Sequence, residues 1–523
     1  MFYEYLSRKA AITFNQFLDN FRSQILRGRL DQQQSLRNHK VVMEVKPNAL
    51  ESNQPPRKSG FNKYVLLCSL LASTNSILLG YDTGVMSGAV LYIKDYMKIN
   101  SVKVEILVGS LNVCSLIGSL LSGKTSDLIG RRYTIVLAAM TFLVGAIVMG
   151  LAPNYGILLA GRLLAGVAVG YALMIAPLYT SEIAPPSKRG FLTSLPEFFI
   201  VMGILLGYIV NYILSDLPPN INWRLMLGIA ALPSVIILFG VIIMPESPRW
   251  LVGKDRIDQA REVLIKISDS PQEAEFRLEE IVKVHKESKN KNTKGVWKEI
   301  LIPTPAVRRM LVAAIGINFF MQASGNDAVI YYTPQVLKAA GIHNKKFMFG
   351  VNVIMGLSKT GFVLISAIFL DRFGRQPLLF IGTTGMVVSL AVLGAGSKVL
   401  ENSTDKPLWA IVMSIIAVCA DVSFFSIGLG PITWVYSTEI FPSKIRAQAS
   451  GLAISVNRLV SGAVAMSFLS ISEAISFGGM FFVLSGIMVV ANIHFYFFLP
   501  ETKGKTLEEM VKIFEKNDSK QET

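Results

Sequence analysis

Long apolar stretches recur along the chain and are separated by short polar segments. A helix needs about 20 apolar residues to cross about 30 Å of hydrocarbon, so each stretch is long enough to span a membrane. Twelve spans are predicted, at 64–88, 105–123, 134–152, 155–178, 191–214, 223–244, 311–335, 347–370, 377–397, 408–436, 448–470 and 475–499. The pattern therefore predicts an all-α membrane protein.

The two sets of six predicted spans carry the same polar landmarks in the same order. An Asp-x-x-Gly-Arg motif, a Tyr-x-x-Glu-Ile-x-Pro motif followed by an arginine, and a Pro-Glu-Ser/Thr motif each occur twice. Their charged members are Asp127, Arg131, Arg132, Glu182, Arg189 and Glu246, and then Asp371, Arg375, Glu439, Arg446 and Glu501. Membrane spans with an internal repeat predict two similar bundles around a central site, as in a carrier.

The repeat divides the chain into five regions. We predict a disordered cytoplasmic tail at 1–60, six-helix bundles at 61–244 and 311–499, a cytoplasmic helical linker at 245–310 and a cytoplasmic tail at 500–523. Met43 is an alternative start, which would remove the unusual first stretch of the tail.

Composition and charge agree with a membrane protein. The chain is 51% hydrophobic and 17% charged, whereas a soluble protein carries about 25% charged residues. The net charge of +15 does not indicate a nucleic-acid partner, because the basic residues concentrate in alternate loops and in the 245–310 segment. By the positive-inside rule, that segment and both termini face the cytoplasm.

The few cysteines and histidines exclude several classes of site. The three cysteines all fall inside predicted spans, and the chain has only four histidines. These numbers give no support for a disulfide framework, a metal site or another cofactor. Because no nucleophile–base pair or cofactor loop is recognisable either, we do not expect an enzyme.

Two charged residues are predicted deep in the outer half of the membrane. Asp82 lies about 27 Å along the first span from its cytoplasmic end, and Arg162 about 12 Å along the fourth span from its outer end. The two side chains can therefore meet. A conformational change that separates them would leave Asp82 ready to accept a proton, because an unpaired charge in hydrocarbon is costly. A purely structural ion pair is the alternative.

A second group of polar residues is predicted near the middle of the membrane. Lys359 is too deep to reach the surface easily, and its candidate partners are Asp327 and Glu197. Asn457, Arg458 and Asp421 are also deep, and Trp434 follows the helix breakers of the tenth span. Carboxylates and amides suit a polyhydroxylated solute, because each hydroxyl both donates and accepts. The alternatives are charges that only join helices and a tryptophan that only packs.

The duplicated motifs fall at the cytoplasmic ends of the spans. We expect Arg131 and Arg375 to pair with Glu182 and Glu439 and to lock the two bundles together on the inner side. Opening inward would have to break these pairs.

These motifs also carry a family resemblance. The run from Gly123 to Arg132, Pro177-x-Tyr179-x-x-Glu182, the run from Pro245 to Arg249, and Pro500-Glu501-Thr502-x-Gly504 resemble the sugar porter branch of the major facilitator superfamily over about residues 60–510. Within that branch the chain is most similar to plant polyol/monosaccharide transporters. The residues that carry this similarity are Glu197, Lys359 and the run Met321-Gln322-Ala323-Ser324-Gly325-Asn326-Asp327.

The resemblance implies a major facilitator fold of 12 transmembrane helices, in which Asp82 with Arg162 carries the proton. It implies that Gln322, Trp434 and Asn457 contact the substrate, together with Glu197, Asp327 and Lys359. Met321 departs from the acid or amide usual in the family, and the resemblance does not account for Asp421.

The sequence thus predicts a proton-coupled symporter that imports polyols, cyclitols or monosaccharides by alternating access, as a monomer in the lipid bilayer of a plasma membrane. An uncoupled facilitator with the same site is the first alternative. A sugar sensor that does not transport is the second, although the final tail of about 24 residues is short for signalling.

Overall fold

The computed structural model describes residues 62–503, except 186–188, 291–295, 340–341, 343, 404–405 and 443–444, and also residue 514. Residues 1–59 and 60–523 form separate units. The predictions made for residues 1–60, including the start at Met43, fall outside the described residues. Every regular element that the structure describes is a helix.

Eleven helical segments among the described residues are long and apolar enough to cross a membrane. In the first half they comprise α2 (Lys63–Thr74) with α3 (Ile77–Met97), α4 (Ser101–Ile129), α5 (Arg131–Gly150), α6 (Tyr155–Ile183), α7 (Arg189–Leu214), and α8 (Pro219–Gly228) with α9 (Ala231–Gly240). In the second half they comprise α16 (Lys345–Phe373), α17 (Arg375–Asn402), α18 (Leu408–Ile427) with α19 (Leu429–Glu439), α20 (Arg446–Ile475) and α21 (Phe477–Phe498).

The seventh predicted span is not one continuous helix. Residues 311–335 fall on two helices, α14 (Pro305–Ala323) and α15 (Asn326–Ala339), and neither is among the eleven segments. The chain turns between them at Gly325, whose φ of +77° lies in the left-handed region. Glycine adopts this conformation at little cost because it has no Cβ. Beyond the break, α15 packs against α16 and α20 of its own half and against α3 of the first half.

Gly325→Ala is therefore expected to destabilise the protein by about 1–2 kcal/mol or more, the usual cost of a left-handed conformation for a residue with a Cβ. The added Cβ would also lie 2.6 Å from Leu484 Cδ1. The measurement is the thermal unfolding midpoint of the purified protein. Gly361→Ala is the matched control, because its Cβ would meet nothing within 4 Å. Equal midpoints for the two variants would contradict this account of the break.

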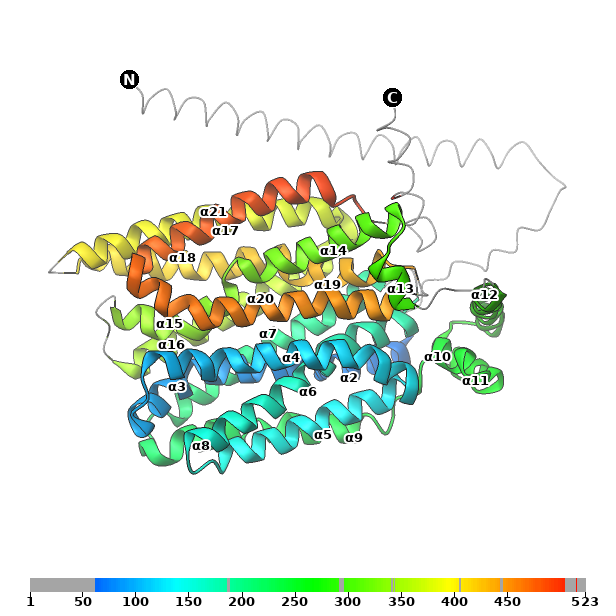
Figure 1. Cartoon of the computed structure of the whole chain (residues 1–523), viewed down its shortest axis with the longest axis horizontal. Coiled ribbons are helices and arrows are strands. Elements are labelled where there is room, and N and C mark those ends of the chain that lie inside the picture. Colours follow the sequence, from blue (N-terminus) through cyan, green and yellow to red (C-terminus); the bar gives the residue numbers. More distant parts are fainter. Residues whose placement is uncertain are drawn as a thin grey trace, which may run out of the picture. The chain divides into compact units, whose positions relative to one another are not determined.

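The helices of the two halves lie side by side along the bundle (Figure 1). Helices α4 and α20 are in extensive contact, as are α7 and α16, so these pairs form the interface between the halves. Within the first half, α3 and α7 approach closely: a Cβ at Gly80 would lie 1.8 Å from the carbonyl oxygen of Ile200. Small residues allow such close packing of membrane helices. This packing places α3, which carries Asp82, beside α7, which carries Glu197.

The predicted linker forms four helices at one end of the bundle, which we call the linker end (Figure 1). They are α10 (Pro248–Gly253), α11 (Ile257–Ile267), α12 (Pro271–Asn290) and α13 (Val296–Leu301). The apolar face of α11 is buried at Ala260, Leu264 and Ile267. Trp250 of α10 donates from Nε1 to the carbonyl oxygen of Asp127 at 3.1 Å, which holds α10 against the end of α4.

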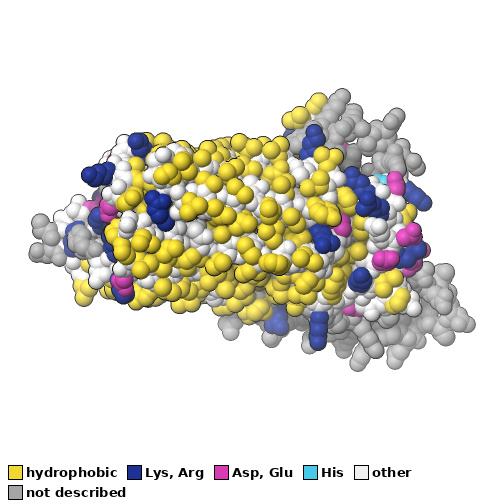
Figure 2. All heavy atoms as spheres, turned by 90° about the horizontal axis from the view of Figure 1, so that it is seen from below, with side chains coloured by type: hydrophobic (Ala, Val, Ile, Leu, Met, Phe, Trp, Pro, Cys, Tyr) yellow, Lys and Arg dark blue, Asp and Glu magenta, His cyan; other side chains and the backbone are white. Residues whose placement is uncertain are grey.

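Apolar side chains cover the middle of one face, and charged side chains gather toward both ends of it (Figure 2). Backbone polar groups in hydrocarbon must be satisfied internally, and helices meet that requirement. We call the end opposite the linker helices the far end.

Candidate functional site

Asp82 and Arg162 form an ion pair inside the first half. Both oxygens of the Asp82 carboxylate lie 2.7 Å from Arg162 Nη1, and both residues are 0% exposed. Arg162 also donates to the α4 carbonyl oxygens of Leu107 (3.1 Å) and Val108 (3.2 Å). The structure thus brings together α3 and α6 at the pair predicted from depth. The role of the pair in proton transfer stays a prediction.

This ion pair lies close to the second half. Thr83, the residue after Asp82, has its Oγ1 3.2 Å from the Tyr331 hydroxyl of α15. One hydrogen bond therefore joins α15 to the helix that carries the acid, and the two helices also pack against each other.

Glu197 and Trp434 link the two halves directly. Trp434 Nε1 of α19 donates to Glu197 Oε2 of α7 at 2.7 Å, and both residues are 2% exposed. The helix breaks predicted around Gly428 are present, because α18 ends at Ile427 and α19 begins at Leu429. Gly430 lets α19 approach the acid, since a Cβ there would lie 3.0 Å from Glu197 Oε1.

Lys359 of α16 lies between α15 and α18. Its Nζ donates to Asn326 Oδ1 at 3.3 Å and lies 4.7 Å from the centroid of the Phe425 ring. No ion pair joins it to either predicted partner, Asp327 or Glu197, both of which the structure describes. Glu197 and Asp327 nevertheless act on the ammonium electrostatically. Asn326 was missed by sequence reasoning, although it is adjacent to a predicted site residue.

Asp327, Gln322 and Asn457 form a hydrogen-bonded group with Arg458. Asp327 Oδ2 accepts from the Ser461 hydroxyl at 2.7 Å and lies 3.9 Å from Arg458 Nη1. With its amide oriented to satisfy the network, Gln322 donates to Asp327 Oδ2 at 2.8 Å and accepts from Arg458 Nη2 at 2.6 Å. Asn457 accepts from Arg458 Nε at 2.9 Å. Arg458 is thus a site residue that sequence reasoning left without a role.

The six predicted substrate residues come together at one place. They lie on α7, α14, α15, α16, α19 and α20, and together with Asn326 and Arg458 we call them the central cluster. All of the six except Asp327 are at most 3% exposed, so they face the interior and not the lipid. Seven groups of the central cluster come from the second half, and Glu197 comes from the first.

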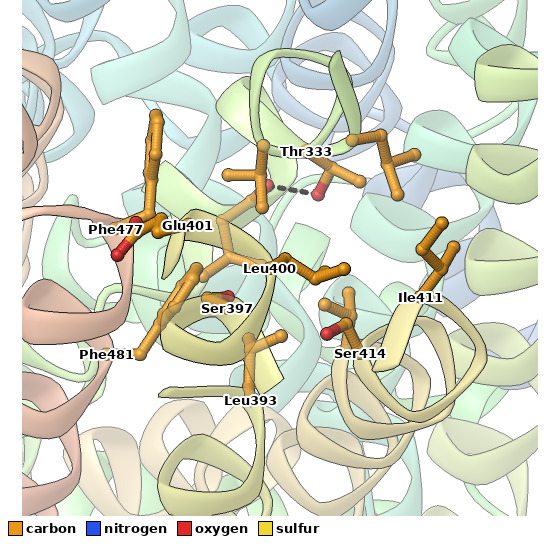
Figure 3. A pocket seen from close by; sticks show the side chains of 13 residues that line it. Thr333, Leu393, Ser397, Leu400, Glu401, Ile411, Ser414, Phe477 and Phe481 are labelled. Carbon is orange, nitrogen blue, oxygen red and sulfur yellow. Dashed lines mark hydrogen bonds between the residues drawn. The ribbon is translucent and has the colours of Figure 1, made fainter. Parts of the chain in front are cut away.

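A separate cavity lies at the far end of the second half (Figure 3). It is lined mainly by apolar side chains, with Thr333, Ser397, Ser414 and Glu401 among them. Glu401 accepts from the backbone N–H of Gly478 at 3.3 Å and so satisfies a donor at the start of α21. None of the six predicted substrate residues lines this cavity, which is therefore distinct from the central cluster.

The duplicated motifs produce duplicated geometry at the linker end. Arg131 pairs with Glu182 through Nε and Nη2, each at 3.0 Å, and with Asp127 at 3.1 Å. Arg375 pairs with Glu439 at 3.1 Å. In both halves the acid of the Pro-Glu motif accepts from the first N–H of a helix: Glu246 from Arg131 N at 2.9 Å and Glu501 from Arg375 N at 3.0 Å.

Glu246 lies outside the spans and accepts also from the backbone N–H groups of Arg132 and Ser247. Burial raises the pKa of the Glu246 carboxyl, while the backbone N–H groups act in the opposite direction. Its position at the beginning of α5 fits the preference of helix N-termini for acids.

At the linker end, the ion pairs of Arg131 and Arg375 named above join residues of the same half. A polar contact crosses between the halves at the linker end, from Gln448 Nε2 of α20 to Asp127 Oδ2 of α4, at 3.0 Å. Arg446 donates to the carbonyl oxygen of Phe441 in its own half. The side chains of Arg189 and Asp371 lie outside the described part. Locking of the bundles by these pairs therefore stays a prediction, whereas Asp127 visibly joins them.

The halves also touch at the far end. Glu105 of α4 accepts from the backbone N–H and the hydroxyl of Ser470 at 2.9 and 2.7 Å. Lys346 of α16 lies 2.7 Å from Asp216, and Lys345 lies 3.5 Å from Asp95. Polar contacts thus join the two halves both above and below the central cluster.

A family model described as "Sugar (and other) transporter" matches residues 68–514. The chain belongs to this transporter family. The transporter is 52% identical over 481 residues to Polyol transporter 5 of Arabidopsis thaliana, a match that covers 90% of this chain and 89% of that protein.

Solved structures share the fold. The major facilitator superfamily proton:xylose symporter XylE, bound to 6-bromo-6-deoxy-D-glucose, matches with a TM-score of 0.77 and 27% identity, over 87% of this chain and 100% of that chain. The inward-open form of XylE from E. coli gives a TM-score of 0.68 and 28% identity, over 86% of this chain and 100% of that chain. The predicted fold class, an all-α membrane protein of the major facilitator fold, is confirmed. The TM-score is lower for the inward-open form. This accords with the contacts that join the two halves of this chain at both ends.

Proposed function

We propose that this transporter is a proton-coupled symporter that imports polyols, cyclitols or monosaccharides by alternating access. The observation that carries the proposal is the central cluster, in which the buried Glu197 of the first half lies with the buried lysine and amides of the second half and with the partly exposed Asp327. Such groups match vicinal hydroxyls, each of which donates and accepts a hydrogen bond. The relative named a polyol transporter and the solved proton:xylose symporter support the same substrate class and coupling.

The geometry suggests how coupling works. A proton on Asp82 weakens its attraction to Arg162 and favours the substrate-competent state that is open at the far end. Solute then binds among Glu197 and the groups of the second half. The halves rock, the Asp127–Gln448 contact opens, and solute and proton leave at the linker end.

The distribution of charge supports an orientation for the chain. We propose that the linker end faces the cytoplasm together with both termini, because the 245–310 segment is rich in basic residues. We place the multi-pass chain in the plasma membrane as a monomer, with bundles at 61–244 and 311–499.

A competition assay tests the substrate class. Sealed vesicles that contain the protein take up labelled sorbitol while unlabelled mannitol, xylitol, inositol or glucose competes, at two external pH values. We expect at least one polyol to compete. Uptake should be faster at the lower external pH, because Asp82 is then protonated more often from outside. Uptake that is independent of pH would favour an uncoupled facilitator, and binding without uptake would favour a sensor.

A further inference from the structure

Asp421 is a buried acid that the proposed transport cycle does not use. It lies nearly two turns before the end of α18, is 0% exposed, and neither of its carboxylate oxygens has a hydrogen-bond partner among the described residues. Helix α18 carries no other charged residue. An ionised carboxylate buried without donors costs several kcal/mol or more, so such a group needs either a cation or a proton.

Lys359 is the charged group that acts electrostatically on Asp421 from α16, a helix packed against α18. Its ammonium lies over the ring of Phe425, which is one helical turn after Asp421 on the same face of α18. The adjacent Ser358 has its hydroxyl 2.9 Å from that of Ser423, so α16 and α18 touch at this level. Helices α17 and α19, also packed against α18, carry their charged residues only toward their ends.

The charges of this region balance only if one acid is neutral. Two buried cations, Lys359 and Arg458, face Glu197 and Asp327, which act on both of them. Asp421 is the additional acid. The Lys359 ammonium donates to Asn326 and is thus held at the central cluster. An ionised Asp421 would therefore be the negative charge without a cation of its own.

We propose that Asp421 is a second proton-binding residue of the transporter, separate from Asp82, and that its ionisation draws Lys359 away from the substrate site. While the carboxyl holds a proton, Lys359 stays at the central cluster, where its ammonium donates to Asn326. When the O–H bond breaks and the proton leaves to water, the carboxylate attracts the ammonium toward α18. The substrate then loses a cationic donor, so a lower pH favours binding. Asp421 is thus a positioning residue that acts through Lys359.

Infrared spectroscopy of the purified protein tests the proton site without any substrate. A protonated carboxyl absorbs at a higher carbonyl frequency than a carboxylate, and the band is followed as pH is raised. We expect Asp82→Asn to keep a titrating band that Asp421→Asn lacks. If Asp421→Asn does not fold, Asp421→Glu should displace the band instead of removing it. Spectra that Asp421 substitutions leave unchanged at every pH would overturn the proposal.

Sorbitol binding tests the effect on Lys359, and this part depends on the proposed function. In the Asp82→Asn background, the Kd for sorbitol should rise about three- to tenfold as the pH is raised by about two units. Linkage of binding to one ionisation allows a change of this size. Adding Asp421→Asn should remove most of that rise, whereas Ser423→Ala should leave it unchanged. A rise that persists in full without Asp421 would refute the positioning role. Because the infrared titration needs no substrate, absence of sorbitol binding would count against the proposed function alone.

Discussion

Asp82→Asn is expected to abolish uphill accumulation while leaving exchange of solute across the membrane. Asparagine cannot take up a proton, yet its amide oxygen can still accept a hydrogen bond from Arg162, so the packing of α3 against α6 is retained. A potential of 100 mV contributes about 2.3 kcal/mol per proton, which corresponds to an accumulation of about fiftyfold. The variant should reach a ratio of about one. The measurement is the steady-state ratio of labelled sorbitol in proteoliposomes under an imposed potential and pH gradient.

Asp95→Asn is the matched control for this experiment. It is the same substitution on the same helix, but Asp95 is 70% exposed and pairs with Lys345 at 3.5 Å at the far end. An exposed ion pair contributes little, so accumulation should stay near that of the wild type. Wild-type accumulation by Asp82→Asn would place the coupling group elsewhere. A wild-type protein that only equilibrates sorbitol would instead be an uncoupled facilitator.

Depth along a helix was sufficient to predict some contacts. The positions of Asp82 and Arg162 on their spans placed both in the same layer, and two opposite charges in one apolar layer have a strong reason to meet. The duplicated motifs likewise indicated the pairing of Arg131 with Glu182 and of Arg375 with Glu439. These contacts depend on the rise along a helix and on charge, both of which can be read directly from the sequence.

Other contacts depend on which way a helix faces. The partner of Lys359 turned out to be Asn326 and not the neighbouring Asp327, and one residue on a helix changes direction by about 100°. The turn at Gly325 sets that direction, and a glycine inside an apolar stretch does not by itself reveal a break. The sequence also could not show that the described ion pairs at the linker end stay within each half, because that depends on distances between bundles.

Glu197→Gln is expected to raise the KM for sorbitol about two- to thirtyfold, with little change in thermal stability. The glutamine oxygen can still accept from Trp434 Nε1, so the contact between α7 and α19 is retained. What is lost is the negative charge, and hydrogen bonds to charged groups contribute about 1.5–3 kcal/mol, compared with about 1 kcal/mol for neutral ones. The loss of charge also leaves Lys359 with one fewer acid acting on it.

Initial rates of sorbitol uptake over a range of concentrations separate this effect from a loss of folded protein. Glu473→Gln is the charge control, because Glu473 is exposed on α20 and belongs to no part of the central cluster. Trp434→Phe, which removes the donor to Glu197, completes a double-mutant cycle. If the carboxylate and the indole act on the solute as one unit, the combined variant should lose less than the sum of the two single losses. Strict additivity, or a KM that Glu197→Gln does not change, would mean that the buried bridge between the halves only joins helices and does not bind the solute.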